Sequence, residues 1–206
     1  MSKILTNQLA HTSGGAAVFT LPTSDGSANQ FLQTNGSGTL SFASETGTSK
    51  RTTSSNSSLD TNANVNYTGF SSTLKRFDLQ FDGLSTSGAN WGVRLGTGGT
   101  LKTSGHNVGS GYIRSSSNVT SSMDGAFWTY GMNETAYTNN GYFSFNKIGT
   151  TDTWWCNANI SEDGTKDHWF IIFGYVILSG TLDIISFLTE SGTFDAGQVR
   201  LVTYTD

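Results

Sequence analysis

The sequence predicts an all-β protein in which a short N-terminal β-structured trimeric shaft is followed by a jelly-roll-like β-sandwich. The first observation behind this prediction is composition. Aromatic residues make up 12% of the 206 residues and charged residues only 13%, while Gly, Ser, Thr and Asn fill most polar positions. Aromatic side chains suit a pleated sheet, and Gly and Asn suit tight turns. The second observation is the sequence pattern. Short runs of alternating apolar and polar residues are separated by glycine-containing turns.

Residues 1–45 form the first of three predicted segments and contain VFTLPTSDGSANQFLQTNGSGTLSF at 18–42. Small apolar sets alternate there with turn residues, and each set is too small to build a core by itself. Isolated hairpins are marginally stable in water, so we expect three chains to pool these side chains around one axis. The expected core of the trimeric shaft consists of Val18, Phe19, Leu21, Phe31, Leu32, Leu40 and Phe42.

Residues 46–73 form a polar segment that is nearly free of aliphatic side chains. Burial of such a segment offsets little of the entropy lost on ordering it. Two interpretations stay open for this segment: a polar linker, or an exposed strand held by its neighbours.

Residues 74–206 form the predicted sandwich domain, which serves as a knob. Phe77, Leu79 and Phe81 alternate with polar residues and therefore share one face of a strand. The same alternation recurs at Trp91–Leu95 and at Phe143–Phe145. Short strands at regular spacing with turns between them predict a sandwich or a barrel, and we prefer the two-sheet jelly roll.

The run WFIIFGYVIL at 169–178 is apolar at every position except its glycine. It has about half the length of a helix that crosses a bilayer, so we expect a strand and no membrane insertion. Strands of this kind are covered on both sides. One face would pack inside the sandwich and the other against a sister subunit; the alternative is a central strand buried within one domain.

The segment LPTSDGSANQFLQTNGSGTLSF at 21–42 resembles a motif of tail-fibre and appendage proteins of tailed bacteriophages, especially marine ones such as cyanophages. The resemblance covers about a tenth of the chain. The matching residues are Asp25, Gly26, Gln30, Leu32, Thr34, Asn35, Gly36, Gly38, Leu40 and Phe42. Residues 79–88 and 182–201 are similar to strands and turns of jelly-roll modules in phage structural proteins.

This resemblance implies a protein of the virion that forms a homotrimer. It implies that the N-terminal segment attaches to other virion proteins and that the knob faces outward. The expected function is that of a short tail fibre or tail appendage that attaches to a host-surface polysaccharide or protein. The alternative is a head decoration or cement protein that stabilises the capsid.

Catalytic and metal-binding patterns are scarce in the sequence. His11, His106 and His168 lack the spacing of a metal motif, and Cys156 is the only cysteine. The basic residues are scattered, so we expect no nucleic-acid partner. We also expect no cofactor, no metal and no enzymatic activity.

Two groups of acidic and amide side chains are candidate cation sites. Asp60, Asn62 and Asn64 resemble the start of an EF-hand loop, but Val65 and Ser71 occupy its glycine and glutamate positions. The cluster at 162–167 is interpreted as a solvated hairpin tip, with a weak calcium site as the alternative. Glycosidase carboxylates need a defined separation in space that a sequence does not provide.

Aromatic residues are the remaining candidates for a receptor site or a subunit interface. Consecutive residues of a strand point to opposite faces, so one of the adjacent tryptophans is expected in the core and the other on the surface. Tryptophan and tyrosine are enriched at interfaces, which favours core or subunit contacts over a sugar site. The candidates are Trp128, Tyr130, Tyr137, Tyr142, Trp154 and Trp155.

Overall fold

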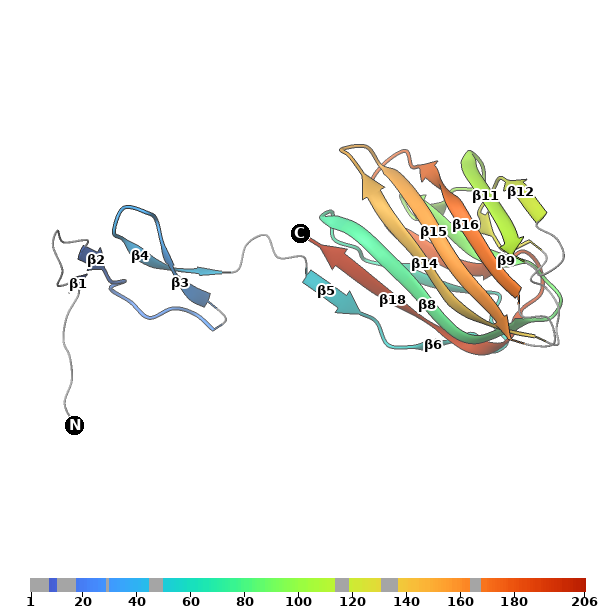
Figure 1. Cartoon of the computed structure of the whole chain (residues 1–206), viewed down its shortest axis with the longest axis horizontal. Helices are drawn as coiled ribbons and strands as arrows, with labels where there is room; N and C mark the ends of the chain where they lie inside the picture. Colours follow the sequence, from blue (N-terminus) through green and yellow to red (C-terminus); the bar gives the residue numbers. More distant parts are fainter. Residues whose placement is uncertain are drawn as a thin grey trace. The chain divides into compact units, whose positions relative to one another are not determined.

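The computed structural model describes residues 8–10, 18–28, 30–44, 50–113, 119–130, 137–163 and 168–206. Strands make up 65% of the structure, and the described residues contain no helix, which confirms the all-β prediction. The chain divides into two compact units, Met1–Thr48 and Ser49–Asp206 (Figure 1). Each unit is described by itself.

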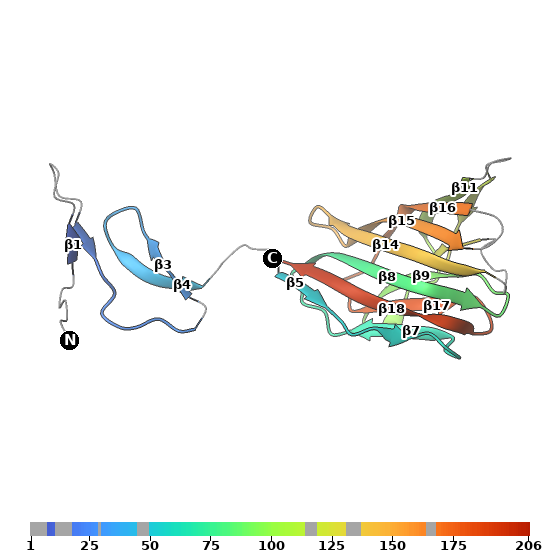
Figure 2. The ribbon, with the colours of Figure 1, turned by 60° about the horizontal axis from the view of Figure 1, so that its bottom comes forward.

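The first unit contains two short antiparallel pairs. Strand β1 (Gln8–Ala10) pairs with β2 (Val18–Thr20), and β3 (Gln30–Thr34) pairs with β4 (Leu40–Ser44) to form the hairpin seen in Figure 2. The turn between β3 and β4 is closed by Asn35, whose Oδ1 accepts hydrogen bonds from the backbone nitrogens of Ser37 (2.8 Å) and Thr39 (3.1 Å). Gly36 follows at φ 77°, a conformation that glycine adopts without strain.

The second unit consists of two antiparallel sheets. The larger sheet has the strand order β12-β11-β16-β15-β14-β8-β18-β5, with β6 paired to β18. Its long strands run side by side across the front of the unit in Figure 1. Its strands are β5 (Lys50–Thr53), β6 (Ser57–Ser58), β8 (Leu74–Thr86), β11 (His106–Ile113), β12 (Val119–Met123), β14 (Thr138–Ile148), β15 (Thr153–Asp163), β16 (His168–Ile177) and β18 (Phe194–Thr205).

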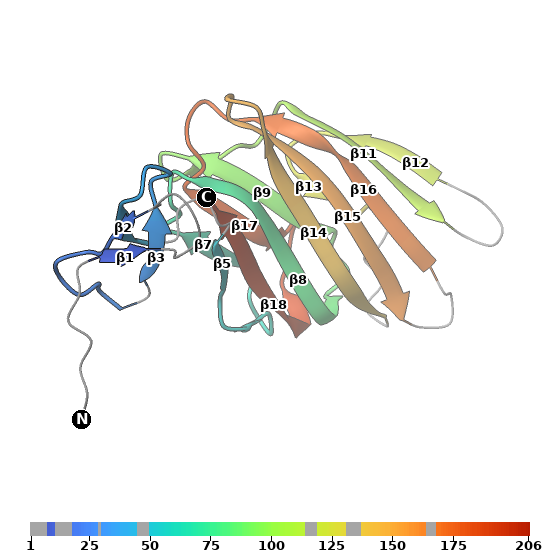
Figure 3. The same cartoon turned by 60° about the vertical axis from the view of Figure 1, so that its left-hand side comes forward.

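The smaller sheet has the order β10-β9-β17-β7, with β13 paired to β9. In Figure 3, β9 and β17 lie behind the strands β8, β14, β15 and β16 of the larger sheet. Its strands are β7 (Asn64–Thr68), β9 (Trp91–Thr97), β10 (Thr100–Leu101), β13 (Phe127–Trp128) and β17 (Ile184–Thr189). The arrangement is sandwich-like, as the sequence predicts.

Aromatic side chains between the two sheets form the core. Phe77, Leu79 and Phe81 are at most 5% exposed, so the predicted inward face of β8 is confirmed. Phe81 meets Trp91 of the smaller sheet edge to face at 5.0 Å between ring centroids. Contacts of this kind add to the hydrophobic stabilisation that holds the two sheets together.

The polar segment 46–73 contributes edge strands where the structure describes it, from residue 50 onward. Strands β5 and β6 pair with β18, and β7 pairs with β17. The segment has few apolar side chains, but Leu59 is fully buried and Tyr67 packs against the core. Main-chain pairing to a neighbour therefore orders a segment that has little to bury.

Candidate functional site

The outer face of the larger sheet carries the most distinctive surface of the second unit. The strands alternate, so each inward core residue is followed by an outward one. Cross-strand register aligns the outward residues of neighbouring strands in rows. One row runs Val202, Asp78, Ser144, Asn157, Phe173, Gly109, and the next runs Arg200, Gln80, Tyr142, Asn159, Ile171, Gly111. Both rows change from polar residues on β8, β14 and β15 to apolar residues on β16.

The apolar part is called the β16 stripe, and it consists of Trp155, Trp169, Ile171, Phe173, Tyr175 and Ile177. Trp169, Phe173 and Ile177 are 57%, 50% and 54% exposed. The ring of Phe173 lies over Gly109 of β11, where a Cβ atom would come within 2.8 Å of it.

The opposite side of β16 faces the core, where Phe170, Ile172 and Val176 are at most 1% exposed. The inward face of the predicted apolar strand is therefore confirmed. The alternative of a strand buried on both sides within one domain is wrong, because the stripe is open to solvent in a single chain.

Beside the stripe lies a polar groove of about 410 Å³. It is lined by Arg76, Asp78, Gln80, Tyr142, Ser144, Asn146 and Asn157. The ring of Tyr142 is 41% exposed and lies among these polar groups.

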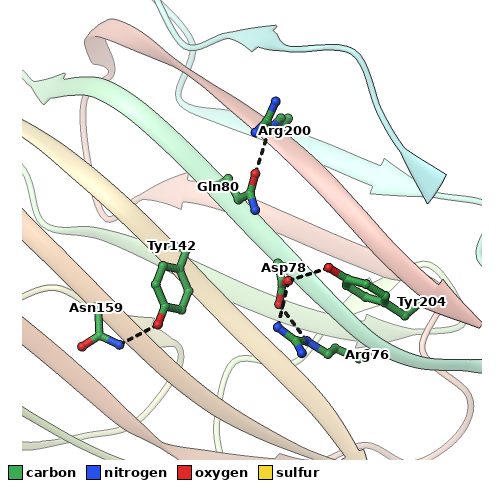
Figure 4. A network of polar contacts seen from close by, with 7 residues as sticks. All are labelled: Arg76, Asp78, Gln80, Tyr142, Asn159, Arg200 and Tyr204. Atoms are coloured by element: carbon green, nitrogen blue, oxygen red, sulfur yellow. Dashed lines mark hydrogen bonds and ion pairs between the residues drawn. The ribbon is translucent and has the colours of Figure 1, made fainter. Parts of the chain in front are cut away.

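The polar groove is organised around the carboxylate of Asp78, which is buried (Figure 4). Asp78 accepts two hydrogen bonds of 3.1 Å from Nε and Nη2 of Arg76 and one of 3.2 Å from the hydroxyl of Tyr204. The hydrogen bond to Asp78 raises the pKa of the Arg76 guanidinium. That guanidinium also lies 5.0 Å from the centre of the Tyr204 ring.

Further hydrogen bonds fix the rest of the groove. Arg200 Nε donates to Gln80 Oε1 at 2.8 Å, and Asn159 Nδ2 donates to the Tyr142 hydroxyl oxygen at 2.9 Å (Figure 4). The same amide of Asn159 donates to Asn157 Oδ1 at 3.2 Å. These contacts join β8, β14, β15 and β18, so the groove is preformed on a paired sheet.

The predicted aromatic candidates fall into two groups. Trp128 and Trp154 are 4% and 1% exposed and belong to the core, so neither is placed to touch a receptor or a sister subunit. Tyr130 and Trp155 are 38% and 41% exposed, Tyr142 lies in the groove, and Tyr137 is half-buried. The expected division between the adjacent tryptophans holds, since Trp154 points inward and Trp155 belongs to the stripe.

The predicted shaft residues stay largely open in a single chain. Phe19, Phe31, Leu32 and Phe42 are 37%, 46%, 47% and 36% exposed, and Leu21 and Leu40 are half-buried. The side chain of Val18 lies outside the described residues.

Phe42 explains one feature of the N-terminal motif. A Cβ atom on Gly26 would lie 2.6 Å from the Phe42 ring, so the ring occupies the space that a side chain at residue 26 would need. The glycine and the aromatic residue of the motif therefore form one contact.

The described residues hold no group of three His, Cys, Asp or Glu side chains placed to bind a metal. The carboxylate cluster at 162–167 lies partly outside those residues. Cys156 is buried, which raises the pKa of its thiol. No helix in the described part of the chain has the length and hydropathy to cross a membrane.

Sequence reasoning missed most of the polar groove. The alternation in KRFDLQFD places Arg76, Asp78 and Gln80 on one face of β8, and this signal was open to detection. Their partners Tyr204 and Arg200 are more than a hundred residues away in sequence, and no local pattern connects them.

Comparison with models of protein families, with curated proteins and with solved structures found no match for this chain.

Proposed function

We propose that this chain is a non-enzymatic structural protein of a phage particle that works as a homotrimer. In this proposal the N-terminal unit is an attachment shaft that contacts other virion proteins. The sandwich is the outward knob of a short tail fibre or tail appendage that attaches to the host surface.

The observation that carries the proposal is the exposure of large apolar side chains on both units. Phe31 and Leu32 of the first unit and Trp169 and Phe173 of the second are each 46–57% exposed. Large exposed apolar side chains of this kind mark interaction sites, because covering them removes apolar area from water. Other copies of the same chain expose the same apolar residues, so association of copies can cover the apolar surface of both units.

The strand connections support the jelly-roll part of the proposal. Strands β8 and β18 are neighbours in the larger sheet, and β9 and β17 are neighbours in the smaller sheet. The chain thus passes between the sheets from β8 to β9 and returns from β17 to β18. A hairpin folded across two sheets in this way is the repeated unit of a jelly roll.

Trimerisation fits the role in attachment. Three knobs on one shaft engage a repetitive host surface together, so weak contacts at each knob sum to strong binding. The resemblance of residues 21–42 to phage appendage segments supports the location on a virion.

Two measurements test the proposal. Sedimentation equilibrium of the full chain should give the mass of a trimer, and antibody–gold labelling of intact particles should place it on the tail. A monomer at micromolar concentration would overturn the trimer. Label spread over the head would replace the tail appendage by a head decoration protein.

A further inference from the structure

We propose that the polar groove binds a neutral saccharide, with Tyr142 as its stacking surface and the amides and guanidinium around it as its hydrogen-bonding groups. This inference deepens the proposed function by naming a ligand class for host attachment. Its biological role rests on that proposed function, whereas the binding itself does not.

The chemistry of the groove lining suits a saccharide. Every sugar hydroxyl is both a donor and an acceptor, so a saccharide site needs both kinds of group within a short span. The groove offers the guanidinium of Arg76, the amides of Gln80, Asn146 and Asn157, and the hydroxyl of Tyr142. The Tyr142 oxygen accepts from Asn159, and the hydroxyl keeps its own proton to donate.

The aromatic ring of Tyr142 lies among these polar groups. A pyranose has an apolar face of C–H groups, and a ring that is 41% exposed among polar side chains offers it a flat apolar surface. Trp155 is the cross-strand neighbour of Asn146 and is also 41% exposed. Its ring stacks on Tyr175 within the β16 stripe, so a second exposed aromatic surface lies beside the groove.

The charges in the groove lining favour a neutral ligand. The lining contains one cation, Arg76, and one anion, Asp78, and the two form an ion pair of 3.1 Å. Their charges compensate within the groove, so the site exerts little attraction on phosphate, sulfate or carboxylate groups. This favours a neutral saccharide over an acidic polysaccharide or a nucleic acid.

The groove is preorganised for binding. The side chains that face a ligand are already fixed by Asp78, Asn159 and Arg200, and they stand on long paired strands. Binding therefore orders few additional rotamers, which lowers its entropic cost. A weak site of this kind gains avidity when three copies act together.

Affinity electrophoresis of the full-length protein tests the inference. Native gels contain laminarin, galactomannan or dextran as neutral polysaccharides, and dextran sulfate as the acidic one. We expect retardation by at least one neutral polysaccharide. The Tyr142→Ala variant should weaken this retardation by about tenfold, and Asn157→Ala should weaken it by a similar factor.

Tyr130→Ala is the matched control, because Tyr130 is 38% exposed and lies outside the groove lining. It should leave the retardation unchanged, and all variants should keep the melting temperature of the parent protein. If Tyr142→Ala has a lower melting temperature than the parent protein, the retardation of Asn157→Ala alone tests whether the groove binds the polysaccharide.

Three results would overturn the inference: no retardation by any neutral polysaccharide, retardation only by dextran sulfate, or equal losses in the Tyr142 and Tyr130 variants. A trimer located on a virion with a groove that fails this test would leave the proposed function standing. A monomer that binds a neutral polysaccharide through Tyr142 would support the saccharide site and overturn the proposed trimer.

Discussion

His106 is a buried imidazole that the fold keeps neutral. Its side chain is fully inaccessible, and its ring meets Phe127 edge to face at 5.4 Å between centroids. Burial lowers the pKa of His106 to about 4, and Asp124, whose Oδ1 is 3.7 Å from Nδ1, opposes this shift only in part. Lys102 and Arg94 add to the lowering.

The stability of the sandwich is therefore expected to fall as the pH drops from about 6.5 to about 4. In this window the unfolded chain binds a proton at His106 that the folded chain does not, so acid favours unfolding. The part of the folding stability that depends on a neutral His106 is fully present above the pKa of this residue in the unfolded chain. About 3 kcal/mol of the free energy of unfolding is lost across the window.

Urea unfolding of the parent protein and of His106→Leu, at one protein concentration and at several pH values, measures this contribution. The parent should lose about 3 kcal/mol more than the variant between pH 7 and pH 4. Parallel pH profiles would contradict this, because they would show that His106 has the same pKa in the folded and unfolded chains.

Asp78 and Asp82 lie on the same face of β8 and differ in their surroundings. Asp78 is buried and accepts three hydrogen bonds, whereas Asp82 is exposed. Asp78→Ala leaves Arg76 and Tyr204 without their acceptor, so we expect a loss of about 2 kcal/mol in the free energy of unfolding. Asp82→Ala should change it by less than about 0.5 kcal/mol. Equal effects in denaturant titrations would contradict the structural role of Asp78.

At the scale of one strand, the two faces of β16 have different roles: the inward face stabilises the fold, and the outward face is the proposed subunit contact. Its inward residues complete the core, so Phe173→Asp on the outward side should leave the monomer fold intact. Covering a phenylalanine side chain contributes about 1.5–3 kcal/mol. The variant should therefore raise the dissociation constant of the proposed trimer by at least about tenfold.

Sedimentation at a series of protein concentrations measures this constant, with circular dichroism to verify the fold. Tyr130→Asp is the control, since it places the same charge at an exposed aromatic position outside the stripe. If both variants associate like the parent protein, the stripe is no subunit interface.

Strands in which apolar residues alternate regularly with polar ones were predictable from the sequence. Strands that are ordered mainly by main-chain hydrogen bonds to a neighbouring strand were less predictable. Phe77–Phe81 alternates with period two, which fixed the inward face of β8. Strands β5 and β6 carry almost no apolar signal, because their order comes from main-chain hydrogen bonds to β18. The polar groove escaped prediction for a related reason: contacts such as Tyr204 to Asp78 join strands that only the completed sheet brings together.

At the scale of the whole molecule, apolar surface is exposed on a chain with very little charge. Only 13% of residues are charged and the net charge is -4, yet each of the two units exposes several large apolar side chains. Association through such surface gains its free energy from water release. Salt screens charge–charge interactions and leaves this driving force in place.

The proposed trimer should therefore persist across a wide range of ionic strength. We expect its dissociation constant to change by less than about threefold between about 0.05 M and about 1 M NaCl, because few charges are present to be screened. Interfaces built on ion pairs weaken steeply over this range as the screening length falls from about 14 Å to about 3 Å. Sedimentation of the full chain in both buffers makes the measurement. A tenfold or larger loss of affinity in high salt would assign the interface to charged residues and would exclude the β16 stripe as its main contact.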